Sequence, residues 1–69
     1  MIKLYSQPSC GQCRLVHLLL DKKQIPYEDI QDVAKMQEVG VEHTPTLELD
    51  DNTRLVGKAI LDYLNKGAN

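Results

Sequence analysis

The sequence predicts a small α/β domain in which four strands and three helices follow the order β-α-β-α-β-β-α. Two observations indicate this class. Short β-prone segments alternate with helical segments, and turn residues such as proline and glycine separate most of them. Strands joined through helices favour parallel pairing with right-handed crossovers, and two strands joined by a short turn add an antiparallel edge. We therefore expect residues 1–69 to form one domain, a four-stranded mixed sheet flanked by three helices.

The first half of the chain supplies a strand, a helix and a second strand. Residues 2–5 form a short strand that ends in a polar turn. A helix is expected over residues 11–23, with Ser9 or Cys10 at its N-cap, because its apolar residues recur at helical spacing (Val16, Leu19 and Leu20). This helix has to end before Pro26, since a residue that precedes proline disfavours helical backbone angles. Residues 27–30 make the second strand.

The second half supplies a short helix, a hairpin and a final helix. Asp32 is a suitable N-cap for the short helix, and Gly40 is suited to end it. Residues 46–50 and 53–56 form a β-hairpin around the two-residue turn Asp51-Asn52. After Gly57, an apolar stripe predicts the last helix, which ends near Lys66 and Gly67 (Ile60, Leu61 and Leu64).

Composition and charge exclude several classes of function. The net charge of −2 and the pI near 5.5 argue against nucleic acid as a partner, because binding phosphates needs a basic surface. The longest leucine run, Leu18–Leu20, is too short to span a membrane. The N-terminus enters a strand directly, without the pattern of a secretory signal, so we expect a cytoplasmic protein whose thiols are kept reduced. A monomer is the default expectation.

The two cysteines, Cys10 and Cys13, lie where the first turn becomes a helix. A disulfide between them would close a loop too small to stabilise the fold much, so the pair is a poor structural crosslink. The free N–H groups and the dipole of a helix N-terminus favour a thiolate at Cys10. Cys10 would then attack a substrate disulfide, and Cys13 would resolve the mixed disulfide. Gly11 allows the turn and leaves space for the substrate, and Gln12 offers a polar side chain.

The tripeptide His43-Thr44-Pro45 precedes the third strand and has two interpretations. Proline at the start of a strand is tolerated anywhere, so it can simply open the strand. With a CxxC motif earlier in the chain, a cis Thr44–Pro45 bond that faces the cysteines is the second interpretation. The backbone of Thr44 would then bind an extended substrate.

These motifs together resemble the glutaredoxin-type members of the thioredoxin superfamily. The resemblance depends on Cys10-Gly11-Gln12-Cys13 after the first strand, Thr44-Pro45-Thr46 before the third, and Gly57 before the last helix. It implies a thioredoxin fold in its minimal glutaredoxin-type form, a cis bond before Pro45, and dithiol–disulfide exchange without a bound organic cofactor. Catalytic residues would be Cys10 and Cys13. The substrate-binding candidates surround them (Gln7, Gly11, Gln12, Thr44, Pro45 and Tyr5). Tyr5 leads into the active loop, although its other interpretation is a core residue.

The sequence also departs from that family. Glutaredoxins typically have Pro-Tyr between the cysteines, a Lys or Arg where Gln7 stands, and a Gly-Gly pair where Gly57 stands alone. These departures weaken glutathione as the electron source and favour the NrdH-redoxin type, which is reduced by a thioredoxin-reductase-type enzyme. A disulfide-containing protein such as ribonucleotide reductase would be the substrate.

Three alternatives to the redox function remain open. Cys10 and Cys13 could bind zinc together with His17 and His43, since two cysteines and two histidines suit tetrahedral zinc. An iron–sulfur cluster could be held by Cys10 from two protomers with glutathione. A non-catalytic adaptor is the third alternative, although a second thiol at position 13 has no obvious purpose there.

Overall fold

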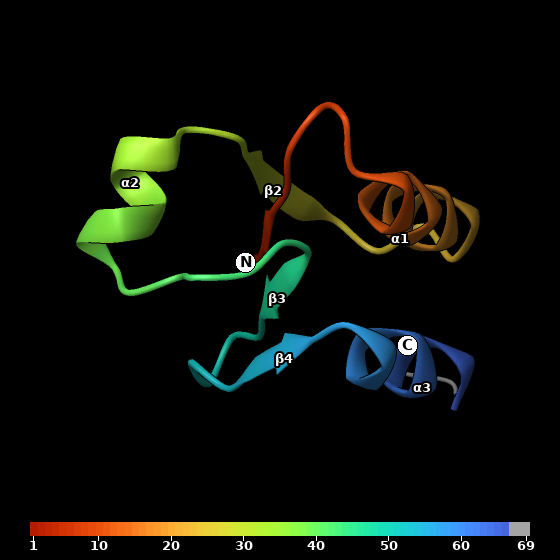
Figure 1. Cartoon of the computed structure of the whole chain (residues 1–69). Helices are drawn as coiled ribbons and strands as arrows, with labels where there is room; N and C mark the ends of the chain where they lie inside the picture. Colours follow the sequence, from red (N-terminus) through yellow and green to blue (C-terminus); the bar gives the residue numbers. More distant parts are fainter. Residues whose placement is uncertain (67–69) are drawn as a thin grey trace.

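A four-stranded mixed sheet organises the chain, and its elements follow the predicted order (Figure 1). This computed structural model describes residues 1–66. The strands are β1 (Ile2–Tyr5), β2 (Tyr27–Ile30), β3 (Thr46–Glu48) and β4 (Arg54–Val56), and the helices are α1 (Gly11–Lys22), α2 (Val33–Glu38) and α3 (Lys58–Asn65). The strand order is β2-β1-β3-β4. β1 pairs with β2 in parallel, and β1–β3 and β3–β4 are antiparallel. This architecture is consistent with a thioredoxin-like fold.

Helices cover both faces of the sheet, and each face has its own apolar cluster. Leu4 of β1 and Leu47 of β3 are register partners, and both are fully buried. They pack against α1 and α3 through four helix residues (Val16, Leu20, Ile60 and Leu64). Since neighbouring side chains of a strand point to opposite faces, Tyr5 lies on the other face, where it packs with Met36 and Val41. Figure 1 shows α1 and α3 on one side of the sheet and α2 on the other.

Both ends of α2 follow the local signals in the sequence. Asp32 is the N-cap, and its Oδ1 accepts the backbone N–H of Ala34 at 3.0 Å. Gly40 has a positive φ of 81°, which suits a residue without a Cβ. The N–H of Val41 donates to the carbonyl of Met36 at 2.7 Å and closes the helix end, as in a Schellman motif. The turn at Gly40 ends α2, and the chain continues from there into the segment before β3.

Some boundaries differ from the sequence prediction. α1 ends at Lys22 with Lys23 as its C-cap, one residue earlier than expected. The hairpin was expected to turn on Asp51-Asn52 alone, but β3 and β4 are shorter than predicted. The N–H of Leu49 donates to the carbonyl of Thr53 at 2.8 Å, so three residues form the turn instead of two. The predicted helix end at Gly67 lies outside the described residues.

No helix within residues 1–66 combines the length and apolar character needed to cross a membrane.

Candidate functional site

The two thiols lie at the start of α1, directly after the loop that leaves β1. The N–H of Cys10 donates to the carbonyl of Gln7 at 3.2 Å, which closes a turn ahead of the helix. Cys10 is the N-cap of α1, with extended backbone angles (φ −93°, ψ 114°). Its Sγ accepts the backbone N–H of Cys13 at 3.2 Å. A sulfur atom thus occupies the capping position that an oxygen of serine or aspartate usually holds, where partial positive charge gathers.

The two thiols have different environments. Cys10 is partly exposed, whereas Cys13 is only 1% exposed. The hydrogen bond from the Cys13 thiol lowers the pKa of Cys10, and the hydrogen bond from the Cys13 backbone N–H lowers it further. Burial is the main cause that raises the pKa of Cys13. The accessible thiol is therefore the more acidic one. This asymmetry is what an attacking thiolate at Cys10 and a protected resolving thiol at Cys13 require.

The segment before β3 lies beside Cys10, in agreement with the second of its two interpretations. The Thr44–Pro45 peptide bond is cis. The Cys10 Sγ lies 4.0 Å from the carbonyl oxygen of Thr44. Pro45 is fully buried, and the hydroxyl of Thr46 donates to the carbonyl of His43 at 2.6 Å. Pro45 anchors the segment in the interior, and the backbone of Thr44 borders the reactive sulfur.

The other proposed substrate-binding residues differ in their exposure to solvent. Gln7, Gly11 and Gln12 are exposed around the thiols. Gly11 was expected to allow the turn and to leave space for the substrate; in the structure it has no positive φ and begins the helix. An added Cβ there would meet no heavy atom within 4 Å, so Gly11 contributes open space and no special backbone conformation.

The expectation that Tyr5 could line the groove is wrong. Its side chain is 1% exposed and packs with Met36 and Val41 beneath α2. The physical reason is that α2 covers the second face of the sheet and removes this face from solvent. Tyr5 is a core residue, which was the other interpretation of its place in the sequence.

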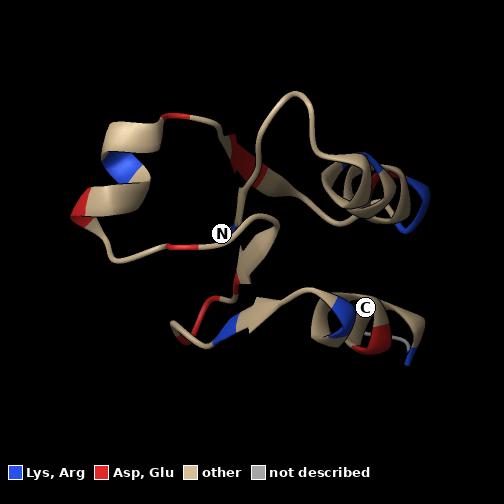
Figure 2. Ribbon diagram, viewed as in Figure 1, with Lys and Arg blue, Asp and Glu red and all other residues tan. Residues whose placement is uncertain are grey.

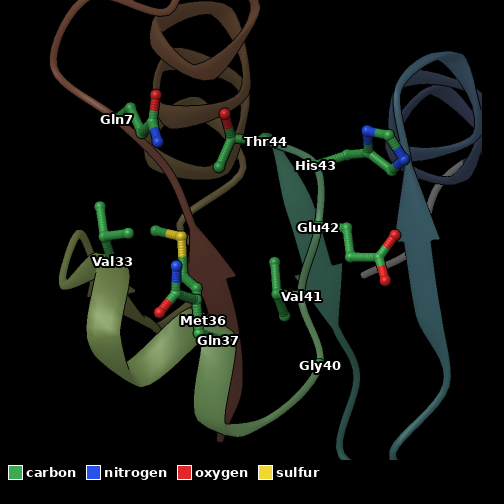
Figure 3. A pocket seen from close by; sticks show the side chains of 9 residues that line it. All are labelled: Gln7, Val33, Met36, Gln37, Gly40, Val41, Glu42, His43 and Thr44. Atoms are coloured by element: carbon green, nitrogen blue, oxygen red, sulfur yellow. The ribbon is translucent and has the colours of Figure 1, made fainter.

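Two hollows flank the start of α1. The smaller, about 280 Å³, contains both thiols and is also lined by Arg14 and His17. The larger, about 680 Å³, lies between α2, the β1–α1 loop and the segment that leads to β3 (Figure 3). Gln7 lines both hollows. The larger one therefore adjoins the thiols without containing them.

A polar cluster between α1 and β2 was not expected from the sequence. Ser6 is fully buried, and its hydroxyl donates to Asp29 Oδ1 at 2.7 Å. His17 Nδ1 lies 2.8 Å from the hydroxyl of Tyr27, and His17 Nε2 lies 3.6 Å from Asp29 Oδ1. Burial is the main cause that raises the pKa of Tyr27.

The alternative zinc site is not assembled. His17 lines the hollow of Cys10 and Cys13, whereas His43 lines the other hollow. Across residues 1–66, no three side chains of His, Cys, Asp or Glu gather closely enough to hold a metal ion. The ring of His17 is directed towards Tyr27 and Asp29 instead.

Comparison with known proteins gives a partial match. Two curated proteins, from Bacillus cereus and Bacillus anthracis, are both named global transcriptional regulator Spx 1. Each is 35% identical to this chain over 54 residues, and the match covers 61% of this chain and 41% of the relative. The chain thus spans less than half the length of these relatives. No family model matches the chain, and no solved structure matches it.

The similarity agrees with the fold. The mixed sheet, the two helical layers and the similarity to these regulators support membership of the thioredoxin-like superfamily. They do not distinguish a glutaredoxin type within it. A CxxC motif at the start of α1 is compatible with a redox-related role.

Proposed function

We propose that this chain is a dithiol–disulfide oxidoreductase that reduces protein disulfides through Cys10 and Cys13. The observation that carries the proposal is the asymmetry of the pair. Cys10 is partly exposed and has a lowered pKa, and Cys13 is buried next to it with a raised pKa. A metal site or a structural crosslink needs no such difference, whereas stepwise exchange between two thiols does.

The reaction is a two-electron exchange in two steps. The thiolate of Cys10 attacks one sulfur of the substrate disulfide, forms a mixed disulfide and releases the other substrate sulfur as a thiolate. Cys13 then loses its proton and attacks Cys10 Sγ, which releases the second substrate thiolate. The substrate gains two electrons and two protons, and the chain is left with a Cys10–Cys13 disulfide. A thiol reductant or a reductase must restore the dithiol.

Single substitutions of the cysteines test this proposal. The prereduced protein is mixed with a disulfide-linked peptide, and free thiols are measured over time. We expect Cys10→Ser to lose activity, and Cys13→Ser to stop at the mixed disulfide, which intact-mass analysis detects as an adduct on Cys10. If Cys10→Ser were as active as the unchanged protein, the mechanism would be wrong.

The electron source is the next part of the proposal. Gln7 stands where a cation helps to bind glutathione in the family that the sequence resembles, and Gly57 has no second glycine beside it. Both features favour a thioredoxin-reductase-type enzyme over glutathione, with ribonucleotide reductase as one suitable protein substrate. Coupled assays with glutathione plus glutathione reductase, and with NADPH plus thioredoxin reductase, separate the two sources. Faster turnover with glutathione would contradict the preference.

A second candidate function follows from the comparisons. The two relatives are named as transcriptional regulators, so the same cysteine pair could act as a redox-sensitive switch in a regulatory protein. The two functions differ in turnover. A reductase reduces many substrate disulfides per molecule when it is supplied with reductant, whereas a switch is oxidised once and keeps its disulfide. Metal analysis of protein purified under reducing conditions tests the zinc and iron–sulfur alternatives, since stoichiometric metal would contradict both redox functions.

A further inference from the structure

The second step of the proposed exchange needs a proton acceptor near Cys13. The Cys13 side chain is 1% exposed, and burial is the main cause that raises its pKa. A thiol attacks as a thiolate, so Cys13 has to lose its proton before its sulfur can bond to Cys10 Sγ. A base in the same hollow makes this loss easier when solvent connects the two groups.

His17 is the base that this hollow offers. It lines the hollow of about 280 Å³ together with both thiols, and no aspartate or glutamate of residues 1–66 lines it with them. Cys13 and His17 are four residues apart in α1, so they share one face of the helix. His43, the other histidine of the chain, lines the larger hollow instead (Figure 3). Histidine is also the side chain that ordinarily gains or loses its charge between about pH 5 and 8.

Each nitrogen of the His17 ring has a partner. Nε2 lies 3.6 Å from Asp29 Oδ1, and Nδ1 lies 2.8 Å from the hydroxyl of Tyr27. A carboxylate attracts a nitrogen that carries a proton and repels one that carries a lone pair, so we assign the proton of the neutral ring to Nε2. In that form, Nδ1 accepts the O–H of Tyr27.

The same partners can hold a second proton on the ring. Burial is the main cause that raises the pKa of Tyr27, and the Asp21 carboxylate raises it further through its charge and a hydrogen bond. The Tyr27 hydroxyl thus has two acceptors, His17 Nδ1 and Asp21. When Nδ1 is protonated, its N–H donates to the Tyr27 oxygen, and the Tyr27 O–H turns to Asp21. Neither form leaves Nδ1 or the Tyr27 hydroxyl without a partner, which suits a group that takes up and returns a proton.

Two elements supply the charged and titratable groups around His17. β2 contributes Tyr27 and Asp29, and the acidic residues of this strand are red in Figure 2. α1 contributes three groups at positions one helical turn before or after the histidine (Cys13, Arg14 and Asp21). The β1–α1 loop, which also borders the hollow, has no charged residue (Figure 2). Arg14 is the cation of this group, and it is exposed, so solvent and salt screen its repulsion of a protonated ring.

We propose that His17 accepts, through the solvent in the hollow, the proton that Cys13 releases in the second step. The inference rests on the proposed reductase function and deepens it by assigning the proton. The Cys13 S–H bond breaks and its proton passes to His17 Nδ1, while the electron pair that stays on sulfur forms the bond to Cys10. The bond between Cys10 and the substrate sulfur breaks, and the substrate leaves as a thiolate. His17 then returns its proton to the solvent, from which the thiolate is protonated.

An uncharged disulfide, 2,2′-dithiodipyridine, separates the two steps in the prereduced protein. Each step releases one molecule of pyridine-2-thione, which is followed by its absorbance. The first release, by attack of Cys10, becomes faster as the concentration of the disulfide is raised. The second release, by attack of Cys13 within the molecule, does not depend on that concentration. Intact-mass analysis detects the adduct on Cys10 between the two releases.

Replacement of His17 should slow the second release alone. In the unchanged protein, the rate of the second release should rise between about pH 5 and 8, as a histidine loses its charge. His17→Gln should remove this rise and reduce the rate at neutral pH by about 100-fold, the low end of the range for general acid–base catalysis. The first release should stay as it is, because His17 is not among the groups that lower the pKa of Cys10.

Two further variants distinguish a proton acceptor from a merely structural histidine. His43→Gln is the matched control, since His43 does not line the hollow of the thiols, and it should keep the rise with pH. Asp29→Asn should move the rise to lower pH, because the protonated ring loses an adjacent negative charge. The asparagine can still accept the hydrogen bond from Ser6. Circular dichroism establishes that all three variants are folded.

The two releases also separate this inference from the function beneath it. If His17→Gln keeps the rise with pH, or if it slows both releases alike, the inference is overturned and the reductase function stands, because both cysteines still react in turn. If the unchanged protein gives neither release, both proposals fail. A second release that loses its pH dependence in His17→Gln, keeps it in His43→Gln and shifts it in Asp29→Asn supports His17 as the proton acceptor.

Discussion

A single alanine substitution should have opposite effects at two glycines of this chain. Gly57 is the N-cap of α3 and has backbone angles of φ 54° and ψ −128°. Residues with a Cβ rarely adopt this conformation. Gly11 begins α1 without a positive φ. At both positions an added Cβ would meet no heavy atom within 4 Å, so neither substitution creates a clash with a neighbour. The backbone conformation alone distinguishes them.

The expected magnitudes follow from the backbone. At Gly57, alanine should lower the free energy of unfolding by about 1–3 kcal/mol through backbone strain. A smaller part of this loss is offset, because alanine also restricts the unfolded chain. The net loss in the free energy of unfolding should be about 1–2 kcal/mol, and each kcal/mol lowers Tm by about 4–8 °C in a domain of this size. Gly11→Ala lacks the strain and should stabilise the protein by about 0.5 kcal/mol.

Thermal and urea unfolding, followed by circular dichroism, measure both variants. The difference between them is more informative than either value, because the chemical change is the same. Equal shifts at the two positions, or a stabilised Gly57→Ala, would refute the conformational argument. Gly11→Ala also adds a methyl group between the two thiols, so its rate with a peptide disulfide shows whether the open space there matters to substrates.

Three further predictions concern the thiols and the interior. Iodoacetamide should modify Cys10 before Cys13, and it should still modify Cys10 at a lower pH than Cys13. The reason is that the pKa of Cys10 is lowered and the pKa of Cys13 is raised. Peptide mapping that found the reverse order would contradict this prediction. Leu47→Ala should reduce the free energy of unfolding by about 2–5 kcal/mol, measured by urea denaturation, since Leu47 is fully buried between the sheet and two helices. Ser6→Ala should cost about 1–2 kcal/mol in the same assay, because it removes the 2.7 Å hydrogen bond to Asp29; no change would show that water replaces it.

Local signals in the sequence predicted the parts of the fold that depend on neighbouring residues. Asp32 and Gly40 cap α2 as expected, because capping involves only a few consecutive residues. Cys10 was one of two candidates for the N-cap of α1, and the structure selects it. The cis Thr44–Pro45 bond was one of two interpretations of its segment, and it is present.

Contacts between distant residues could not be predicted in the same way. Ser6 and Asp29 are 23 residues apart, and His17 and Tyr27 are 10 residues apart, yet all four meet between α1 and β2. Each of them has an ordinary local interpretation as a turn, strand or helix-surface residue. Their polarity alone does not reveal which element covers them, so this cluster depends on the tertiary arrangement.

The same limit explains the error at Tyr5. Leu4 and Tyr5 are consecutive and therefore face opposite sides of the sheet, yet both are buried. Alternation along a strand identifies the two faces, but it does not show whether the short helix α2 covers the second one. In a chain this small, that single helix decides whether Tyr5 is a core residue or lines the surface near the thiols.

The surroundings of the thiols thus combine local and tertiary features of the structure. The pKa of Cys10 is lowered first by the hydrogen bond from the Cys13 thiol, whereas the sequence prediction had attributed a lowered pKa to the N–H groups and dipole of the helix N-terminus. Gln7 borders both hollows, which is a consequence of the tertiary arrangement. A cation at this position would add positive charge to both at once. With Gln7 in its place, Arg14 is the arginine beside the thiols, and the larger hollow is lined by no Lys or Arg. The departure at residue 7 therefore leaves both hollows without a cation at this position, which supports the proposed preference for a reductase over glutathione as the electron source.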